Sequence, residues 1–208
     1  MVPVKLAGLL LMPGQEFLSG LEITHPHIRR LEDLWPKATQ RTAEEMAQPL
    51  RVIFPHTVPH PLAEAALLRH APQAEWVDVS AHHEAYYTLL GRLWEDGRPF
   101  LVIEHDVEIR AGLVDELAAC PEVWCAFQYA GPGGGMLGTS LGCTRFGAAL
   151  LEAEPDLVRV NPTRDWRRLD CELLPALQRR GYAPHFHEPP VKHHHRYNGI
   201  CACGEEHE

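Results

Sequence analysis

Apolar and polar residues alternate in short blocks along the central part of the chain. Apolar runs over 51–54 and 100–103 have the length of buried strands, and Pro55 closes the first of them. Between these runs, residues 62–70 are rich in Ala and Leu at helical spacing and follow Pro61, which suits a first helical turn. The pattern therefore predicts a strand followed by a helix.

The same unit repeats before the second apolar run. Residues 75–79 predict a strand, and residues 82–95 predict a helix that Ser80 caps and Gly97 ends. Strands that alternate with helices are typical of a parallel sheet with right-handed crossovers. We therefore predict an α/β fold with a mostly parallel, Rossmann-like central sheet flanked by helices, in which ligands gather at the carboxyl ends of the strands.

The rest of the chain predicts further elements and three segments. Helices are expected over 113–119, 146–152 and 165–180, and strands over 123–129, 136–143 and 185–187. The segments are an N-terminal extension or partial outer layer (1–48), a main domain (49–188) and a His/Cys-rich C-terminal tail (189–208).

Composition narrows the class of protein. The 208 residues are 45% hydrophobic, which excludes wholesale disorder, and the net charge of -9 argues against broad binding to nucleic acid or to anionic membranes. No stretch approaches the about 20 apolar residues of a membrane span, and the apolar run over 6–12 has no convincing signal-peptide cleavage site after it. Six scattered cysteines are expected to be mainly reduced. These features predict a cytoplasmic protein.

The candidate chemistry begins where the apolar run over 100–103 meets Glu104, His105, Asp106 and Glu108. Alternate residues of a strand share a face, so all three carboxylates converge only if the strand persists. If the chain turns at Asp106, Glu104 and Asp106 remain the pair. Hard oxygen ligands suit Mg²⁺ or Mn²⁺, which favours phosphoryl or glycosyl chemistry. The alternative is an acidic residue that caps the following turn.

A histidine cluster near the C-terminus is the second candidate. His193 and His195 lie on one side of an extended segment, where one of them can complete a cation site opposite Asp106. Two alternatives remain open: a solvated His-rich tail, or a zinc site. Zinc would be bound by these histidines together with Cys201, Cys203 and either His207 or His187.

Taken together, these motifs resemble a GT-A fold glycosyltransferase, the nucleotide-sugar-dependent class that includes family 2-like enzymes. The resemblance covers about 51–195. Its features are the strand-helix-strand-helix opening, Glu104-His-Asp106 in place of the family's DXD motif, the strand over 138–143 that leads into a helix at Phe146, the late helix that opens with 166–170, and His193–His195 after it. The chain departs from the family at Glu104, where DXD has Asp, and in its short catalytic domain.

The resemblance implies a cation site and a donor site. Asp106 would bind Mn²⁺ or Mg²⁺, and Glu104 would bind the metal directly, through water, or bind the donor's ribose instead. His193 or His195 would complete the coordination. His105 would lie beside the donor.

The resemblance also implies a nucleoside pocket and a catalytic base. Asp78 would hold the nucleoside, with Pro55 and His56 beside the base, and Asp170 would deprotonate the acceptor hydroxyl in an inverting reaction. If no carboxylate reaches the acceptor, a retaining mechanism is expected instead. The alternatives for Asp78 and Asp170 are a turn residue and a residue that favours the first turn of a helix because of its dipole.

The function that the resemblance implies is a metal-dependent, hexosyltransferase-like glycosyltransferase. It would move a sugar from a UDP- or GDP-sugar to the hydroxyl of an acceptor that the sequence does not identify. One alternative is a non-catalytic GT-A-like or zinc-stabilised binding module. A nucleotidyltransferase is a weaker alternative, because residues 55–61 lack the expected Gly-rich basic loop.

Overall fold

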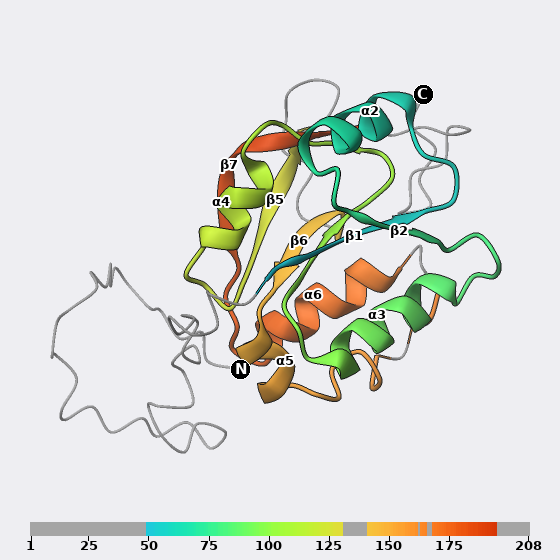
Figure 1. Cartoon of the computed structure of the whole chain (residues 1–208). Coiled ribbons are helices and arrows are strands. Elements are labelled where there is room, and N and C mark those ends of the chain that lie inside the picture. Colours follow the sequence, from blue (N-terminus) through green and yellow to red (C-terminus); the bar gives the residue numbers. More distant parts are fainter. Residues whose placement is uncertain (1–48, 131–140, 162, 166–167, 195–208) are drawn as a thin grey trace, which may run out of the picture. The chain divides into compact units, whose positions relative to one another are not determined.

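A computed structural model describes residues 49–130, 141–161, 163–165 and 168–194 (Figure 1). The predicted extension over 1–48 lies outside these residues, as does the end of the predicted tail. Seven strands and five helices form within the described residues. In chain order they are β1 (Arg51–His56), α2 (Pro61–His70), β2 (Glu75–Asp78), α3 (Ala85–Asp96), β3 (Phe100–Ile103), β4 (Val107–Glu108), α4 (Leu113–Ala119), β5 (Trp124–Ala130), β6 (Cys143–Phe146), α5 (Ala148–Ala153), α6 (Leu169–Arg179) and β7 (His185–His193).

The strands form one sheet in the order β2-β1-β3-β6-β5-β7-β4. The β1–β2, β1–β3 and β5–β7 pairs are parallel, whereas the β3–β6, β5–β6 and β4–β7 pairs are antiparallel. The α/β class is therefore confirmed, but the sheet is mixed and not mostly parallel as predicted. The reason is that β6 runs antiparallel to both of its neighbours, β3 and β5, and so interrupts the parallel direction of the sheet.

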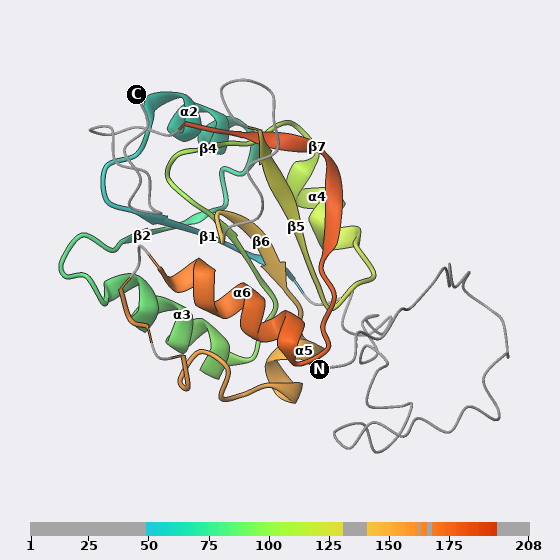
Figure 2. The ribbon, with the colours of Figure 1, turned by 180° about the vertical axis from the view of Figure 1, so that it is seen from behind.

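Helices cover both faces of the sheet (Figure 1, Figure 2). Alternate strand residues face opposite sides, so Ile53 packs with α3, α5 and α6, whereas Val52 and Phe54 pack with α2 and α4. Strand β3 is buried over its whole length and contributes to both layers. The chain that leaves β3 is thus fixed by packing on two sides.

Two helix signals had different outcomes. Gly97 ends α3 with a left-handed φ of 70°, as its position predicts. Ser80 is not the cap, because α3 begins later, at Ala85 after Glu84. The Ser80 amide instead donates a hydrogen bond to Asp78 Oδ1 at 2.8 Å, which closes a turn before the helix. None of the described helices is long and apolar enough to cross a membrane.

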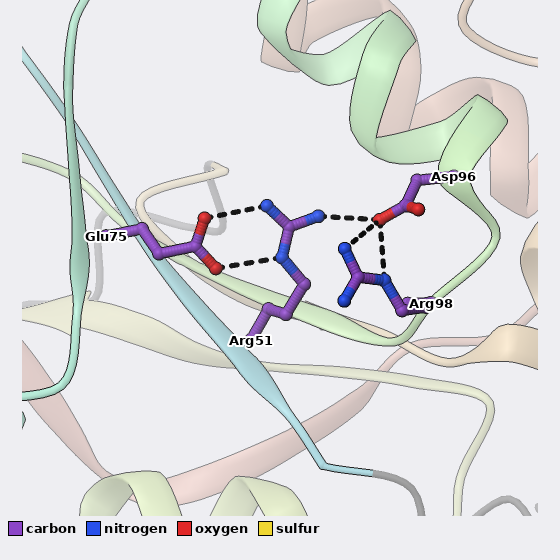
Figure 3. A network of polar contacts seen from close by, with 4 residues as sticks. All are labelled: Arg51, Glu75, Asp96 and Arg98. Carbon is purple, nitrogen blue, oxygen red and sulfur yellow. Dashed lines mark hydrogen bonds and ion pairs between the residues drawn. The ribbon is translucent and has the colours of Figure 1, made fainter.

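An ion-pair network ties together the end of the sheet that lies opposite the carboxyl ends of β1 and β3 (Figure 3). The Arg51 guanidinium donates two hydrogen bonds to the Glu75 carboxylate, at 2.8 and 2.7 Å, and a third to Asp96 at 2.7 Å. Arg98 also donates to Asp96, at 2.8 Å. Residues from β1, β2 and the end of α3 are thereby joined through one bidentate arginine.

We expect Arg51→Met to lower the free energy of unfolding by about 1 kcal/mol, because the bidentate pair is lost while the apolar stem remains. Arg98→Met is the matched control. Its side chain is 60% exposed, against 21% for Arg51, so its loss should cost less. Urea unfolding at neutral pH measures both. Equal losses in the two variants would contradict this account.

Acid should remove the difference between Arg51→Met and the wild type. Arg51 holds the pKa of Glu75 below its ordinary value, and Arg98 and Arg51 do the same for Asp96. A depressed carboxyl pKa contributes stability that is present above the unfolded pKa and is lost as pH falls through the folded pKa. The same unfolding measurement repeated at acid pH checks the sign.

Candidate functional site

Residues 104–107 form a turn directly after β3, the acidic turn. The Val107 amide donates to the Glu104 carbonyl at 3.1 Å, and the Glu104 amide donates to the Gly142 carbonyl at 2.9 Å. The strand therefore ends at Ile103, so Glu104, Asp106 and Glu108 do not share one face of an extended strand. This is the second of the two arrangements that the sequence left open, in which Glu104 and Asp106 remain the pair.

Glu104 is partly buried beneath Tyr86. The Tyr86 hydroxyl donates to Glu104 Oε1 at 2.9 Å. Burial, followed by the negative charges of Asp106 and Asp170, raises the pKa of Glu104 from 4.5 to about 8, although the bond from Tyr86 opposes this. In the protein without ligand, Glu104 is thus mostly a neutral acid at pH 7. It can bind a cation only when it ionises.

Asp106 pairs with His193, far along the chain. His193 Nε2 lies 3.1 Å from Asp106 Oδ2, and both side chains are largely buried. Burial alone would raise the pKa of Asp106, but the hydrogen bond from His193 and the positive charge of the protonated His193 imidazole outweigh it and lower the pKa. Asp106 is therefore the ionised carboxylate of this turn.

Backbone pairing and ring stacking hold this contact. Strand β4 pairs with the end of β7 so that Val107 lies opposite His193, and the His194 amide donates to the Asp106 carbonyl at 2.8 Å. The Tyr129 ring stacks on the His193 imidazole with centroids 4.2 Å apart. Strand β7 is longer than the predicted strand over 185–187, and this extra length delivers His193.

The neighbouring histidine has different partners. His194 Nε2 lies 2.8 Å from Glu108 Oε2, and its ring stacks on His60 with centroids 4.1 Å apart. Glu108 therefore takes part in an ion pair with His194, and Lys192 adds a second at 3.4 Å. His195, the other predicted ligand, lies outside the described residues.

Gly142, directly before β6, allows the backbone to pass close to the side chains of this site. A Cβ atom on Gly142 would lie 1.9 Å from Tyr129 Oη and 2.6 Å from Glu104 Oε2. Both distances are far below van der Waals contact, so only glycine fits here. Gly142 thus lets Tyr129 and Glu104 converge on the turn after β3.

The residues predicted to bind the nucleoside lie at the ends of β1 and β2. His56 and Asp78 are partners in the parallel register, and Pro55 pairs with Val77. The exposed Asp78 carboxylate accepts the Ser80 hydrogen bond, which lowers its pKa. This geometry agrees with the turn residue that was the alternative for Asp78, and it leaves nucleoside binding a prediction.

His105 supports the loop that follows β1. Its Nδ1 accepts a hydrogen bond from the Thr57 amide at 3.4 Å, and its carbonyl accepts one from the His60 amide at 2.8 Å. Burial lowers the pKa of His105, which keeps the imidazole neutral and able to accept. The structure thus shows a positioning contact for His105, and its role in donor binding stays a prediction.

Asp170 lies in the first turn of α6, which begins at Leu169 and not at the predicted Asp165. Its charge is among the causes that raise the pKa of Glu104, so the two carboxyl groups are within electrostatic reach of each other. The carboxylate predicted to act as base therefore lies near enough to the acidic turn to influence the ionisation of Glu104. Its role as a base remains a prediction.

A separate group of potential metal ligands escaped the sequence analysis. In the described part of the chain, Cys120, Cys125 and His187 place their ligand atoms within 4.8 Å of one another. The Cys-x₄-Cys spacing was the available signal, but it is too common to identify a site. His187 was considered only as a partner of Cys201 and Cys203, which lie outside the described residues.

Comparisons with protein-family models, with curated protein sequences and with solved structures found no match to this chain.

Proposed function

We propose that this chain is a metal-dependent glycosyltransferase of the GT-A type. It would transfer a sugar from a UDP- or GDP-sugar to an acceptor hydroxyl at the carboxyl end of β3. The proposal goes beyond the α/β class of the fold, and it rests on how the residues of the resemblance lie relative to one another.

The arrangement of the sheet supports this type of fold. Strand β3, which ends in the acidic turn, lies between the parallel β1 and the antiparallel β6. The loop after β1, the acidic turn after β3 and Gly142 before β6 therefore meet at one edge of the sheet. Ligands of open α/β sheets bind at such an edge.

The contact between Asp106 and His193 carries the proposal. The resemblance implies that a late histidine completes the cation site at the acidic motif, and the Asp106 and His193 side chains lie 3.1 Å apart. This contact needs the end of β7 to pair with the two-residue strand β4, which no local pattern demands. An ordinary acidic turn has no need of such a partner.

The potential metal-ligand atoms at this end of the sheet suit a divalent cation. Asp106 offers ionised carboxylate oxygens, His193 offers an imidazole nitrogen, and Glu104 offers further oxygens when it ionises. A bound Mn²⁺ or Mg²⁺ would supply positive charge against the leaving nucleotide diphosphate. Tyr129 and the His194 amide hold the first two ligands in place, so little ordering is left for the binding step.

Asp170 is the proposed general base. A base must lie within hydrogen-bond reach of the hydroxyl proton that it removes. Asp170 lies in the first turn of α6, and its charge contributes to the raised pKa of Glu104 in the acidic turn. A separate carboxylate on the acceptor side corresponds to an inverting reaction. Glu104, whose pKa the charges of Asp106 and Asp170 both raise, would bind the metal or the donor's ribose.

Nucleotide binding provides the test. We expect UDP or GDP, or one of their sugar conjugates, to raise the thermal stability of the protein only when Mn²⁺ is present. A nucleotide at 100 times its dissociation constant should add about 2.7 kcal/mol. Asp106→Asn and His193→Gln should remove the metal-dependent part of this response. Differential scanning fluorimetry with and without Mn²⁺ measures it.

Two further variants sharpen the test. Asp115→Asn removes an exposed carboxylate from α4, and it should leave the response unchanged. Asp170→Asn should keep nucleotide binding but slow the turnover of the donor by about 10²–10⁴-fold. If no nucleotide stabilises the wild type in the presence of Mn²⁺ or Mg²⁺, the proposed function is wrong.

A further inference from the structure

The second ligand group lies under α4, on the face of the sheet that α2 and α4 cover (Figure 1). Cys120 is the residue that ends α4, Cys125 is on β5 and His187 is on β7. Because β5 and β7 are parallel neighbours, with Cys125 opposite His185 and Phe127 opposite His187, Cys125 and His187 point to the same face. Three separate elements therefore deliver two sulfur atoms and one imidazole to one place.

The orientation of His187 indicates a missing partner. Its side chain is 9% exposed, and its Nδ1 lies 3.0 Å from Glu116 Oε1. A carboxylate that Arg110 also binds accepts hydrogen bonds, so Nδ1 carries the proton and Nε2 presents a lone pair. That Nε2 is buried and makes no hydrogen bond of ordinary geometry in the described part of the chain, and the Cys120 thiol is close enough to His187 to interact with it. A histidine held by a carboxylate in this way is the usual arrangement of a metal-binding imidazole.

A buried cation beside Cys125 adds a second, independent observation. Arg145 is fully buried, and its Nε donates to Cys125 Sγ at 3.3 Å. Its Nη2 donates to the Glu122 carbonyl, and in the described part of the chain its Nη1 is buried without a hydrogen-bond partner and no carboxylate pairs with the guanidinium. Burying an arginine without an anion is costly, and thiolates beside it would remove that cost.

We propose that Cys120, Cys125 and His187 bind a zinc ion between α4 and the β5–β7 pair. Thiolate and imidazole ligands suit Zn²⁺, and tetrahedral bonds of about 2.0–2.3 Å would separate the ligand atoms by about 3.5–3.8 Å. The observed limit of 4.8 Å is within a small adjustment of this. Glu116 positions His187, and the fourth tetrahedral place is left for water or another ligand. This site is independent of the proposed transferase activity.

Metal content of the tag-free chain tests the proposal. Protein purified from zinc-supplemented medium should contain about one zinc per chain by plasma mass spectrometry. Cys125→Ala should lose it, whereas Cys143→Ala, the same change at another fully buried thiol of this core, should keep it. The double change Cys201→Ser with Cys203→Ser should also keep it, which separates this site from the predicted tail site.

Glu116→Gln tests the site even if Cys125→Ala does not fold, because all three ligands remain. We expect it to hold zinc about 10–100-fold more weakly in competition with a chelator. Cobalt substitution of the wild type should give thiolate-to-metal charge-transfer bands. The proposal is overturned by zinc-free wild type without such bands, by a Cys120–Cys125 disulfide in the native protein, or by zinc that depends on Cys201 and Cys203 instead.

Discussion

Replacing Gly142 by alanine should lower the free energy of unfolding by about 3 kcal/mol and remove the metal-dependent response to nucleotides. The new Cβ would lie 1.9 Å from Tyr129 Oη and 3.1 Å from Tyr129 Cζ. Tyr129 is 3% exposed and stacks on His193, so its ring cannot swing aside without moving the imidazole. Overpacking of this kind typically costs about 1–3 kcal/mol. Thermal and urea unfolding measure the loss.

Two variants serve as controls for the Gly142 substitution. Gly91→Ala lies inside α3, where an added Cβ meets nothing within 4 Å. It should stabilise the protein by about 0.5–1 kcal/mol, because alanine restricts the unfolded chain and favours the helix. Combining Gly142→Ala with Tyr129→Phe removes the atom that would lie nearest, so part of the stability should return. If Gly142→Ala is as stable as the wild type, the Tyr129 side chain does not lie as close to Gly142 as described.

The elements that the sequence predicts best are those with an apolar run and a clear boundary. The strand over 100–103 and the helix over 113–119 match β3 and α4. Strand β1 extends two residues beyond its predicted end, across Pro55. A proline is tolerated there because β3 pairs only with Arg51–Ile53, so β1 has only β2 beside it at Pro55.

The elements that the sequence misses depend on partners far along the chain. Strand β4 has two residues and exists because β7 pairs with it, so periodicity cannot reveal it. The strand expected over 136–143 lies mostly outside the described residues, whereas β6 is Cys143–Phe146, between β3 and β5. The mixed direction of the sheet follows from the antiparallel pairing of β6 with both neighbours and was not visible in the alternation of strands and helices.

Some residues of the candidate site could likewise be predicted from the sequence, and others could not. Glu104 and Asp106 stand out because charged residues follow a buried apolar run, and the resemblance suggested His193 as a partner. The Tyr86 hydrogen bond and the Gly142 contact come from side chains on other elements, so no spacing predicts them. Cys120, Cys125 and His187 meet only because α4 packs on the β5–β7 pair.

Glu104→Gln should stabilise the protein without ligand by at most about 4 kcal/mol at pH 7.5, and by almost nothing near pH 4.5. Burial and the charges of Asp106 and Asp170 raise the folded pKa to about 8, whereas the unfolded value stays near 4.5. A raised pKa contributes stability that is fully present below pH 4.5 and is lost as pH rises through about 8. Glutamine keeps the acceptor for Tyr86 and cannot ionise, so the variant escapes this loss.

Glu108→Gln is the matched control because it should show the opposite sign. The hydrogen bond from His194 holds the pKa of Glu108 below its ordinary value, so this carboxylate stabilises the fold at neutral pH and loses that effect in acid. Urea unfolding of the two variants and the wild type, from about pH 3 to about pH 8, measures both differences. Tyr86 remains a donor throughout, since burial raises its pKa. A constant difference between Glu104→Gln and the wild type over this range would mean that Glu104 is ionised in the folded protein, and it would then bind a cation without first releasing a proton.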